Sequence, residues 1–568
     1  MAPVNPAPRR AVPGWAFPAA VALLVLWTYW PALSGAFLDW DDNHLLLLNP
    51  HFRGLGREAW RWAWTNNPGL YMPLVWMSFS LDSALWGMNP VGFHLTNVLF
   101  HAANAVLLFF VAETLFERLF PRSSGGARRG AAALASLLWA VHPLRVESVA
   151  WIVERKDVLC GFFFLLSLLF YLRFAATGRS GERWLSAGAH LAGMLSKPVA
   201  VLGPLVFLLL DWRPLARWPG RPWKVLLREK IPFFLASGAA ALLTIAPGGR
   251  PSDVGPAERL GQALFGLGFY LQKTLWPTGL APVYEWRGEI LRWSGPPVFF
   301  MAIGAGFLLL WLFSRRRWPS LWIAGASYLL LLAPLLGLIP RGPQSAADRF
   351  TYLPGLGLAL LAAALPLFLS VRNRRAGAVA AFLLAAALGP LTAATRRQIG
   401  LWKNSETLWR WQLERFPSSF LGHYNLGTYL LNQDRPSEAL PHLDAAVRLH
   451  PDVPDPFNNR GRAFFALDRL EEAGRDFDQA LLLDPAMAEA RLNRGQTFMN
   501  RRRFPEAALD FAEATRRHPE WTAAWIKLGL ARRLAGDLPG AAEAFRRALV
   551  LDPGLDSVRR WLAELPAT

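Results

Sequence analysis

The stretch 452–485 reads DVPDPFNNRGRAFFALDRLEEAGRDFDQALLLDP, and the stretch 486–519 repeats its pattern as AMAEARLNRGQTFMNRRRFPEAALDFAEATRRHP. Each stretch has 34 residues, with Gly, Ala and Pro at the same places. The register extends to both sides of this pair, over 418–551. Its marker residues are Gly427, Gly461, Gly495 and Gly529; Ala439, Ala473, Ala507 and Ala541; and Pro417, Pro451, Pro485, Pro519 and Pro553. A period of this length predicts a stack of two-helix units.

This period is the signature of the tetratricopeptide repeat. The small residues let the two helices of one repeat approach closely, proline ends the second helix, and large apolar residues at helical spacing bury the pair. In the C-terminal domain, 418–568, we predict four repeats over 418–551 and a capping helix over 555–565. A helical connector over 395–417 precedes them. Such a stack forms a concave surface that recruits a protein acceptor or partner, and a passive scaffold is the alternative.

The first 400 residues differ from the repeats in composition. The chain has 568 residues, of which 53% are hydrophobic and 18% charged, and its net charge is +19. Residues 401–568 carry 23 Lys and Arg against 23 Asp and Glu, so the positive charge belongs to residues 1–400. Basic residues between apolar runs follow the positive-inside rule and do not form the basic stripe of a nucleic-acid-binding protein. A single cysteine, Cys160, excludes an intramolecular disulfide and a cysteine-based metal site.

Residues 1–394 contain apolar runs long enough to cross a membrane, so we predict a multi-span helix bundle and, with the repeats, an all-α protein. About 11 spans put the N-terminus in the cytoplasm and the repeats outside, because the loops rich in Arg and Lys then face the cytoplasm. We divide one long run at Lys197-Pro198, since a charge followed by proline marks a turn. The predicted spans are 15–33, 91–117, 131–142, 157–173, 184–197, 198–211, 231–246, 297–313, 320–339, 354–371 and 376–394.

The apolar run 260–276 decides between two topologies. Counting it as a span would give 12 spans, put Arg315-Arg316-Arg317 outside and move the repeats to the cytoplasm. We therefore predict that this run lies in the outer interface or as a re-entrant helix. The external loops are then 34–90, 142–156, 247–296 and 340–353.

The first external loop carries an acidic cluster, DWDDNH over 39–44, directly after the first span. Three carboxylates in four residues can bind a divalent cation, or one of them can act as a general base beside an anionic neighbour. A solvated loop start has the same composition, so Asp41 and Asp42 are candidates on local grounds only.

The second external loop reads HPLRVESVAWIVERKD over 142–157. Arg155 and Lys156 can hold a phosphate, and Glu147 and Asp157 can orient them. The alternative is an interfacial cap of charged side chains that reach out of the apolar layer.

The third external loop, RGPQSAADRFTYLP over 341–354, adds Arg349 beside Tyr352 at the entrance of a span. Together the loops place carboxylates and basic residues at one membrane face, which suits a substrate that is half lipid and half phosphate. The chain has no Gly-rich phosphate loop, HExxH, GxSxG or Cys-based zinc motif. A nucleotide-driven pump, a zinc protease and a serine hydrolase are therefore disfavoured.

These motifs resemble those of the transmembrane and tetratricopeptide-repeat glycosyltransferases, multi-span enzymes of the GT-C architecture related to protein O-mannosyltransferases. The resemblance covers nearly the whole chain. It rests on WDD over 40–42, MNPVGFHLTN over 88–97, the second loop over 142–157, ADRFTYLP over 347–354 and the C-terminal repeats. The second loop is its most specific part.

The resemblance implies a polyprenyl-phosphate sugar as donor, mannose as the sugar, and a protein hydroxyl as the acceptor at the external face. The Ala-, Arg-, Leu- and Pro-heavy usage is typical of bacteria with GC-rich genomes, which predicts an inner-membrane protein with external, periplasmic repeats. Related bacterial sequences often carry another acid where this chain has Asn43. This departure favours a route without a metal or another cofactor.

The mechanism that the resemblance implies is a single inverting displacement. Asp41 or Asp42 takes the proton from the acceptor hydroxyl, which attacks the anomeric carbon while the lipid phosphate leaves. The second acid of the pair stabilises positive charge on the sugar. The predicted phosphate-binding residues are Arg155, Lys156 and Arg349, and the supporting residues are His142, Glu147, Asp157 and Tyr352.

Three other functions remain open from the sequence. An enzyme of the same architecture could transfer sugar to a lipid or an envelope glycan. A non-catalytic, membrane-anchored scaffold predicts that Asp41, Asp42, Arg155 and Arg349 are individually dispensable. A transporter predicts charges that face each other at mid-membrane, whereas here they gather in external loops.

Overall fold

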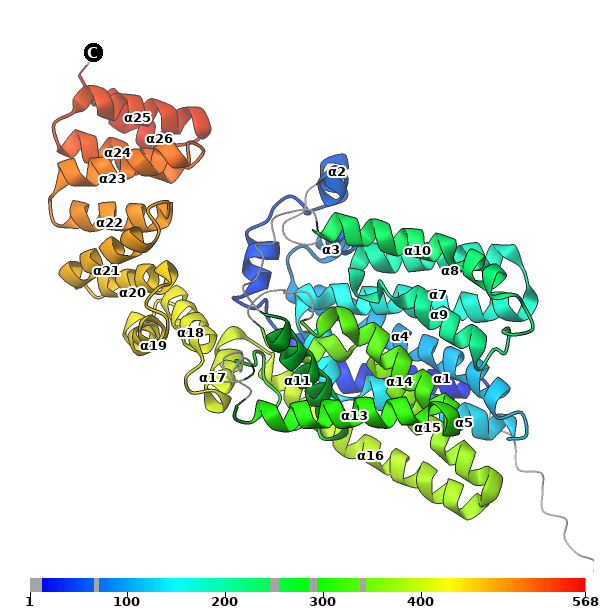
Figure 1. Cartoon of the computed structure of the whole chain (residues 1–568). Coiled ribbons are helices and arrows are strands. Elements are labelled where there is room, and N and C mark those ends of the chain that lie inside the picture. Colours follow the sequence, from blue (N-terminus) through cyan, green and yellow to red (C-terminus); the bar gives the residue numbers. More distant parts are fainter. Residues whose placement is uncertain are drawn as a thin grey trace, which may run out of the picture. The chain divides into compact units, whose positions relative to one another are not determined.

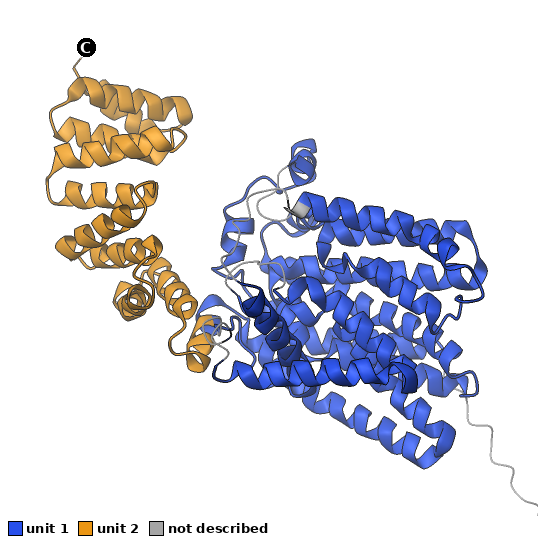
Figure 2. Cartoon of the chain, in the orientation of Figure 1, with its two compact units in different colours: residues 1–408 blue, residues 409–568 orange. Residues whose placement is uncertain are grey.

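The computed structural model describes residues 13–65, 71–245, 255–285, 290, 294–337 and 344–566, so parts of the predicted loops 247–296 and 340–353 lie outside it. Every regular element within these ranges is helical, as predicted for an all-α protein (Figure 1). The chain divides into two compact units, 1–408 and 409–568 (Figure 2). The boundary between them falls within the predicted connector, 395–417.

Unit 1 is a bundle of helices (Figure 1), and its apolar helices are those of an integral membrane protein. Six helices among the described residues are long and apolar enough to cross a membrane. They are α1 with its 3-10 extension η1 (Ala16–Ser34), α4 (Pro90–Leu119), η4 with α7 (Ile152–Thr177), α13 (Pro297–Arg317), α15 (Gly355–Arg372) and α16 (Arg374–Leu401). The other helices that begin in this unit are α2 (Arg57–Thr65), α3 (Pro73–Trp86), α5 (Gly125–Ala140), α6 (Val146–Ala150), α8 (Ser180–Ser196), α9 (Gly203–Trp212), α10 (Trp223–Ile245), α11 (Pro256–Leu275), α14 (Pro319–Leu332) and α17 (Ser405–Arg415). The count of 11 spans stays a prediction.

The predicted break at Lys197-Pro198 is confirmed. Helix α8 ends at Ser196, Lys197 has an extended backbone, and α9 begins only at Gly203. Proline cannot donate a helical hydrogen bond, so the chain turns here. The turn brings Lys197 to the N-terminal end of α7, where its Nζ lies 2.7 Å from Asp157.

The first predicted external loop, 34–90, is largely helical. Helix α3 has only 14 residues, yet it buries Val75, Trp76 and Phe79. It packs against α2, α4 and α8. Its length is below that of a membrane span, which is why the apolar pattern alone assigned it to a loop.

Helix α11, which contains most of the run 260–276, contacts two of the loops that are predicted to be external. Its Gln262 donates to the carbonyl of Ser345. At its other end, the carbonyl of Thr274 accepts from His142 Nε2 at 3.0 Å. Both ends of α11 thus contact loops that are predicted to lie on the same side, and the interface position of 260–276 stays a prediction.

A close backbone approach joins α11 to α13. A Cβ added at Gly268 would lie 1.7 Å from the carbonyl oxygen of Phe300. Only glycine allows two helices to approach this closely, so the position of α11 depends on Gly268.

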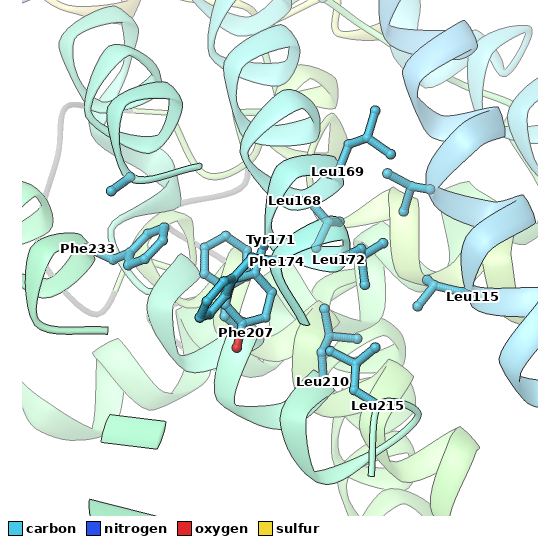
Figure 3. Packing of buried hydrophobic residues seen from close by; sticks show 12 residues of the cluster. Leu115, Leu168, Leu169, Tyr171, Leu172, Phe174, Phe207, Leu210, Leu215 and Phe233 are labelled. Carbon is cyan, nitrogen blue, oxygen red and sulfur yellow. The ribbon is translucent and has the colours of Figure 1, made fainter. Parts of the chain in front are cut away.

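Aromatic packing holds α7, α9 and α10 together (Figure 3). Tyr171 stacks on Phe207 with ring centroids 4.8 Å apart, and Phe233 meets Phe207 edge to face at 5.2 Å. The Tyr171 hydroxyl donates to Asp211, which also pairs with Arg217. These contacts fix one end of the bundle and leave the other end of α7 for the polar cluster described below.

The repeat unit has the predicted helix pairs, which confirms the tetratricopeptide assignment. A Cβ at Gly461 or Gly495 would lie 2.7 Å from the ring of Phe477 or Phe511, so the small residues do permit close packing. The helices are α18 (Phe420–Asn432), α19 (Pro436–Leu449), α20 (Pro454–Ala466), α21 (Leu470–Leu483), α22 (Ala488–Asn500), α23 (Phe504–Arg517), α24 (Thr522–Leu534), α25 (Leu538–Leu551) and the terminal α26 (Asp556–Ala563).

Candidate functional site

Asp41 and Asp42, the adjacent acids of the first loop, have different surroundings. Asp42 is buried, and its two oxygens accept the backbone N–H groups of Leu38 at 2.9 Å and Val153 at 3.3 Å. Burial raises the pKa of Asp42 to about 7. Asp42 therefore links the first loop to the second and has little access to a substrate.

Asp41 is only half-buried and faces a cluster of charges. Burial raises its pKa, and the nearby positive charges of Lys156 and Arg349 oppose this effect. Glu154 also lies within electrostatic range of Asp41. Of the two acids, Asp41 is the one that a substrate can reach beside basic groups.

Glu154 is the centre of this charge cluster. Its carboxylate is 3.0 Å from Lys156 Nζ, 3.2 Å from Lys197 Nζ and 3.3 Å from Arg349 Nε. The side chain of Glu154 is 1% exposed, whereas those of the three basic residues are 9–12% exposed. A buried carboxylate thus holds three cations together at the edge of a cavity.

Arg349 joins the third loop to the second. Its backbone N–H donates to Glu147 Oε2 at 2.8 Å, and its guanidinium pairs with the other oxygen of Glu147. The guanidinium also lies over the ring of Trp151, 5.6 Å from the centroid. Burial lowers the pKa of Arg349, but the carboxylates of Glu147 and Glu154 raise it overall, so the side chain keeps its positive charge.

A small polar pocket opens beside the cluster. It has a volume of about 10 Å³, and Lys197, Arg349, Asp157 and Tyr352 line it together with apolar residues. Asp157 accepts from Lys197 at 2.7 Å and from the hydroxyl of Ser148 at 3.1 Å. The pocket therefore has two cations on its lining, Lys197 and Arg349. Asp157, the partner of Lys197, is fixed by its hydrogen bond from Ser148.

A larger apolar groove lies further along the same helices. Its volume is about 140 Å³, and its lining comes mainly from α4, α7, α9, α14 and α15. On α7, Asp157 belongs to the pocket and Phe164 to the groove. These two residues are about 10 Å apart along the helix, at a rise of about 1.5 Å per residue. A polar pocket and an apolar groove thus follow one another along the bundle.

Arg155 lies in different surroundings from Lys156 and Arg349. It is fully buried, and its guanidinium donates to Asp82 at 2.6 Å, to the carbonyl of Phe93 at 2.8 Å and to Asn97. These partners belong to α3 and α4. The structure therefore gives Arg155 a bonding role inside the bundle and does not place it on the lining of the pocket.

Tyr352 is held by a network with defined hydrogen-bond directions. His101 Nε2 lies 3.0 Å from the carbonyl of Ala140, so it carries the proton, and Nδ1 accepts from the Tyr352 hydroxyl at 2.8 Å. Asn104 donates to the same hydroxyl at 2.9 Å. The hydrogen-bonding capacity of the Tyr352 hydroxyl is thus used within the bundle, although Tyr352 is among the residues that line the pocket.

His142, the remaining predicted residue, connects α11 to the second loop. Its Nδ1 accepts from the backbone N–H of Leu144 at 3.2 Å, and its Nε2 donates to Thr274. The structure thus brings Asp41, Lys156 and Arg349 together with Glu147 and Asp157. It places His142 and Arg155 outside this cluster.

Sequence reasoning missed two members of the cluster, Glu154 and Lys197. Glu154 stands in the quoted loop beside Arg155, but no local feature distinguishes it from Glu147. Lys197 served only to mark a turn, although a charge within a long apolar run is costly unless it has a partner. That cost is the signal that could have identified Lys197.

Comparisons with known proteins agree with both halves of the chain. The tetratricopeptide-repeat family model matches residues 391–454, 424–490, 458–519 and 492–556. Human protein O-mannosyl-transferase TMTC1 is 27% identical over 520 residues, which are 80% of this chain and 58% of that protein. Human TMTC4, also a protein O-mannosyl-transferase, is 43% identical over 107 residues, 18% of this chain and 14% of that protein. The chain thus spans less than two thirds of the length of these curated relatives.

Two solved structures resemble part of the chain. MamA from Desulfovibrio magneticus is 26% identical and covers 25% of this chain and 79% of its own, with a TM-score of 0.24. The tetratricopeptide-repeat protein YrrB is 20% identical and covers 31% of this chain and 88% of its own, with a TM-score of 0.26.

Proposed function

We propose that this protein is a membrane glycosyltransferase that moves mannose from a polyprenyl-phosphate donor to hydroxyl groups of a protein acceptor at the external face. The observation that carries the proposal is the cluster of Lys156, Lys197 and Arg349 around Glu154, beside a pocket that Lys197 and Arg349 line. The half-buried Asp41 lies within electrostatic range of Lys156 and Arg349. The similarity to protein O-mannosyl-transferases over 80% of the chain supports the sugar and the acceptor.

Asp41 is the proposed general base. It takes the proton of the acceptor hydroxyl as the oxygen attacks the anomeric carbon, and the bond from that carbon to the phosphate oxygen breaks. The attack comes from the side opposite the leaving group, so the configuration at the anomeric carbon inverts. Asp42 supports Asp41 by fixing the loop through Leu38 and Val153.

Lys156, Lys197 and Arg349 are the proposed ligands of the donor phosphate. The three cations also pair with Glu154, Glu147 and Asp157, so the phosphate is proposed to replace carboxylate partners where it develops negative charge as it leaves. Lys197 takes the place that the sequence had suggested for Arg155, because Lys197 pairs with Glu154 in the charge cluster, whereas Arg155 pairs with Asp82 inside the bundle.

The apolar groove is the proposed site of the prenyl chain. Its leucine-rich lining matches a hydrocarbon, and it follows the polar pocket along α7. This order along the bundle matches the order of phosphate and chain in a lipid-linked sugar. No step of the proposed reaction needs a metal ion, so transfer is expected to persist when a chelator removes divalent cations.

The decisive test is transfer of label from polyprenyl-phosphate mannose in membranes that contain the purified protein. We expect Asp41→Asn to lower the rate by about 10²–10⁴-fold, the usual effect of losing a general base. Asp42→Asn is the matched control for Asp41→Asn, because it removes the neighbouring carboxylate that fixes the loop. It should reduce the yield of folded protein more than the transfer rate per folded molecule. Label in a lipid or glycan fraction would show that the acceptor is a lipid or a glycan and not a protein. Equal rates for Asp41→Asn and wild type would exclude Asp41 as the base. If the wild-type protein transferred no label, the non-catalytic, membrane-anchored scaffold would be the function to test next.

A further inference from the structure

The chain between α16 and α17 contacts both loops of the proposed site. The carbonyl of Lys403 accepts the backbone N–H of Ala36 at 2.9 Å, and the hydroxyl of Ser405 accepts the backbone N–H of Asp39 at 2.7 Å. The buried ring of Trp402 lies 5.7 Å from the ring of Trp151. Three of the four residues after the last apolar helix, Trp402, Lys403 and Ser405, therefore hold the first loop and support the second.

The Ser405 hydroxyl is not needed to start its own helix. The backbone N–H groups at the start of an α-helix need partners, and the residue before the helix commonly supplies one. Here Asn404 does so, because its side chain accepts from the backbone N–H of Thr407 at 2.9 Å. Ser405 is 2% exposed and directs its oxygen to Asp39 instead.

The segment that carries Asp41 is short and is fixed on both sides. Ser405 holds Asp39, two residues before Asp41. Asp42, the residue after Asp41, is held through its own carboxylate, which accepts the backbone N–H of Val153. Between them, Trp40 stacks on Trp151 with centroids 4.4 Å apart and an interplanar angle of 15°. Removing one of these attachments would let the loop move while the others keep it folded.

We propose that Ser405 is a positioning residue for the transfer reaction. It holds the first loop so that the Asp41 carboxylate stays within electrostatic range of Lys156 and Arg349. This inference rests on the proposed function, since Asp41 must act as the base for its position to matter. A base displaced by about 1 Å can cost on the order of 10²-fold in rate. We expect a lower kcat without a change in the donor KM, because the phosphate ligands belong to other segments.

The test compares Ser405→Ala with Ser405→Thr, which keeps the hydroxyl. Ser370→Ala is the matched control, because the Ser370 hydroxyl donates to Leu367 within its own helix. Purified full-length proteins are assayed for kcat and donor KM with polyprenyl-phosphate mannose. Hydrogen exchange over residues 34–48 is measured in parallel and does not depend on activity.

The expected result is faster exchange over 34–48 and a kcat lower by about 10-fold or more in Ser405→Ala, with Ser405→Thr and Ser370→Ala close to wild type. A Ser405→Ala protein with wild-type kcat, or with unchanged exchange over 34–48, would overturn the inference. Absence of transfer by the wild type would instead count against the proposed function. In that case the exchange measurement alone still decides whether Ser405 holds the loop.

Discussion

Arg155 and Lys156 are neighbours in the sequence but have different surroundings, because consecutive residues of an α-helix point about 100° apart. Arg155 points to Asp82 and Asn97, whereas Lys156 lies beside Glu154 at the edge of the pocket. The sequence predicted both as phosphate ligands, since their partners are up to 73 residues away and cannot be read from the local pattern.

Replacing each of these two residues by Met is expected to change a different property of the protein. Lys156→Met removes one charged hydrogen-bond donor, worth about 1.5–3 kcal/mol, and should raise the donor KM by about 10–100-fold in a folded protein. Arg155→Met leaves Asp82 buried without its cation and should destabilise the fold by about 3–5 kcal/mol. Donor titrations and thermal unfolding distinguish them. A stable Arg155→Met protein with weak donor binding would contradict this prediction and would indicate that Arg155 binds the donor phosphate.

Asp42 should make the stability of unit 1 depend on pH. Its pKa is about 7 in the folded protein, whereas an Asp in an unfolded chain titrates near about 3.9. Between these values the folded state keeps a proton that the unfolded state has released, so the free energy of unfolding falls as the pH rises. In Asp42→Asn this decline between pH 4 and pH 7 should be smaller. Parallel curves of unfolding temperature against pH for both proteins would contradict this prediction.

At the scale of elements, regular patterns were predictable and irregular ones were not. The 34-residue period predicted the repeats because each helix pair buries the same small residues. The break at Lys197-Pro198 was predictable from proline chemistry. Helix α3 was missed because it is apolar but short, and the contact of Lys197 with Glu154 was missed because 43 residues separate them.

The contact between α11 and α13 allows a test with an internal control. Gly268→Ala would place a methyl group against the backbone oxygen of Phe300, so we expect it to cost more than the usual 1–3 kcal/mol of overpacking (~3 kcal/mol or more). Gly306→Ala, on α13, meets nothing within 4 Å and should leave the unfolding temperature nearly unchanged. Equal unfolding temperatures for the two variants would show that α11 does not pack on α13 in this way.

At the scale of the whole molecule, the proposed chemistry requires one topology. The charge cluster and α11 belong to the loops that the charge pattern places outside, so the repeats should face the same side as the site. Reporters fused after Arg317 and after Thr568 should therefore report the cytoplasm and the exterior, respectively. A cytoplasmic signal from the second fusion would mean that α11 crosses the membrane, and the repeats could not then present an external acceptor.

The pairing of Arg349 with Glu147 has a consequence for how a donor would bind. In this structure the guanidinium already has an anionic partner, and that carboxylate is 2% exposed. A phosphate that binds Arg349 must compete with Glu147, and burial, which raises the pKa of Glu147, then favours its protonation. Donor binding would therefore be an exchange of one anion for another, accompanied by proton uptake, and the affinity for the lipid would increase as the pH falls.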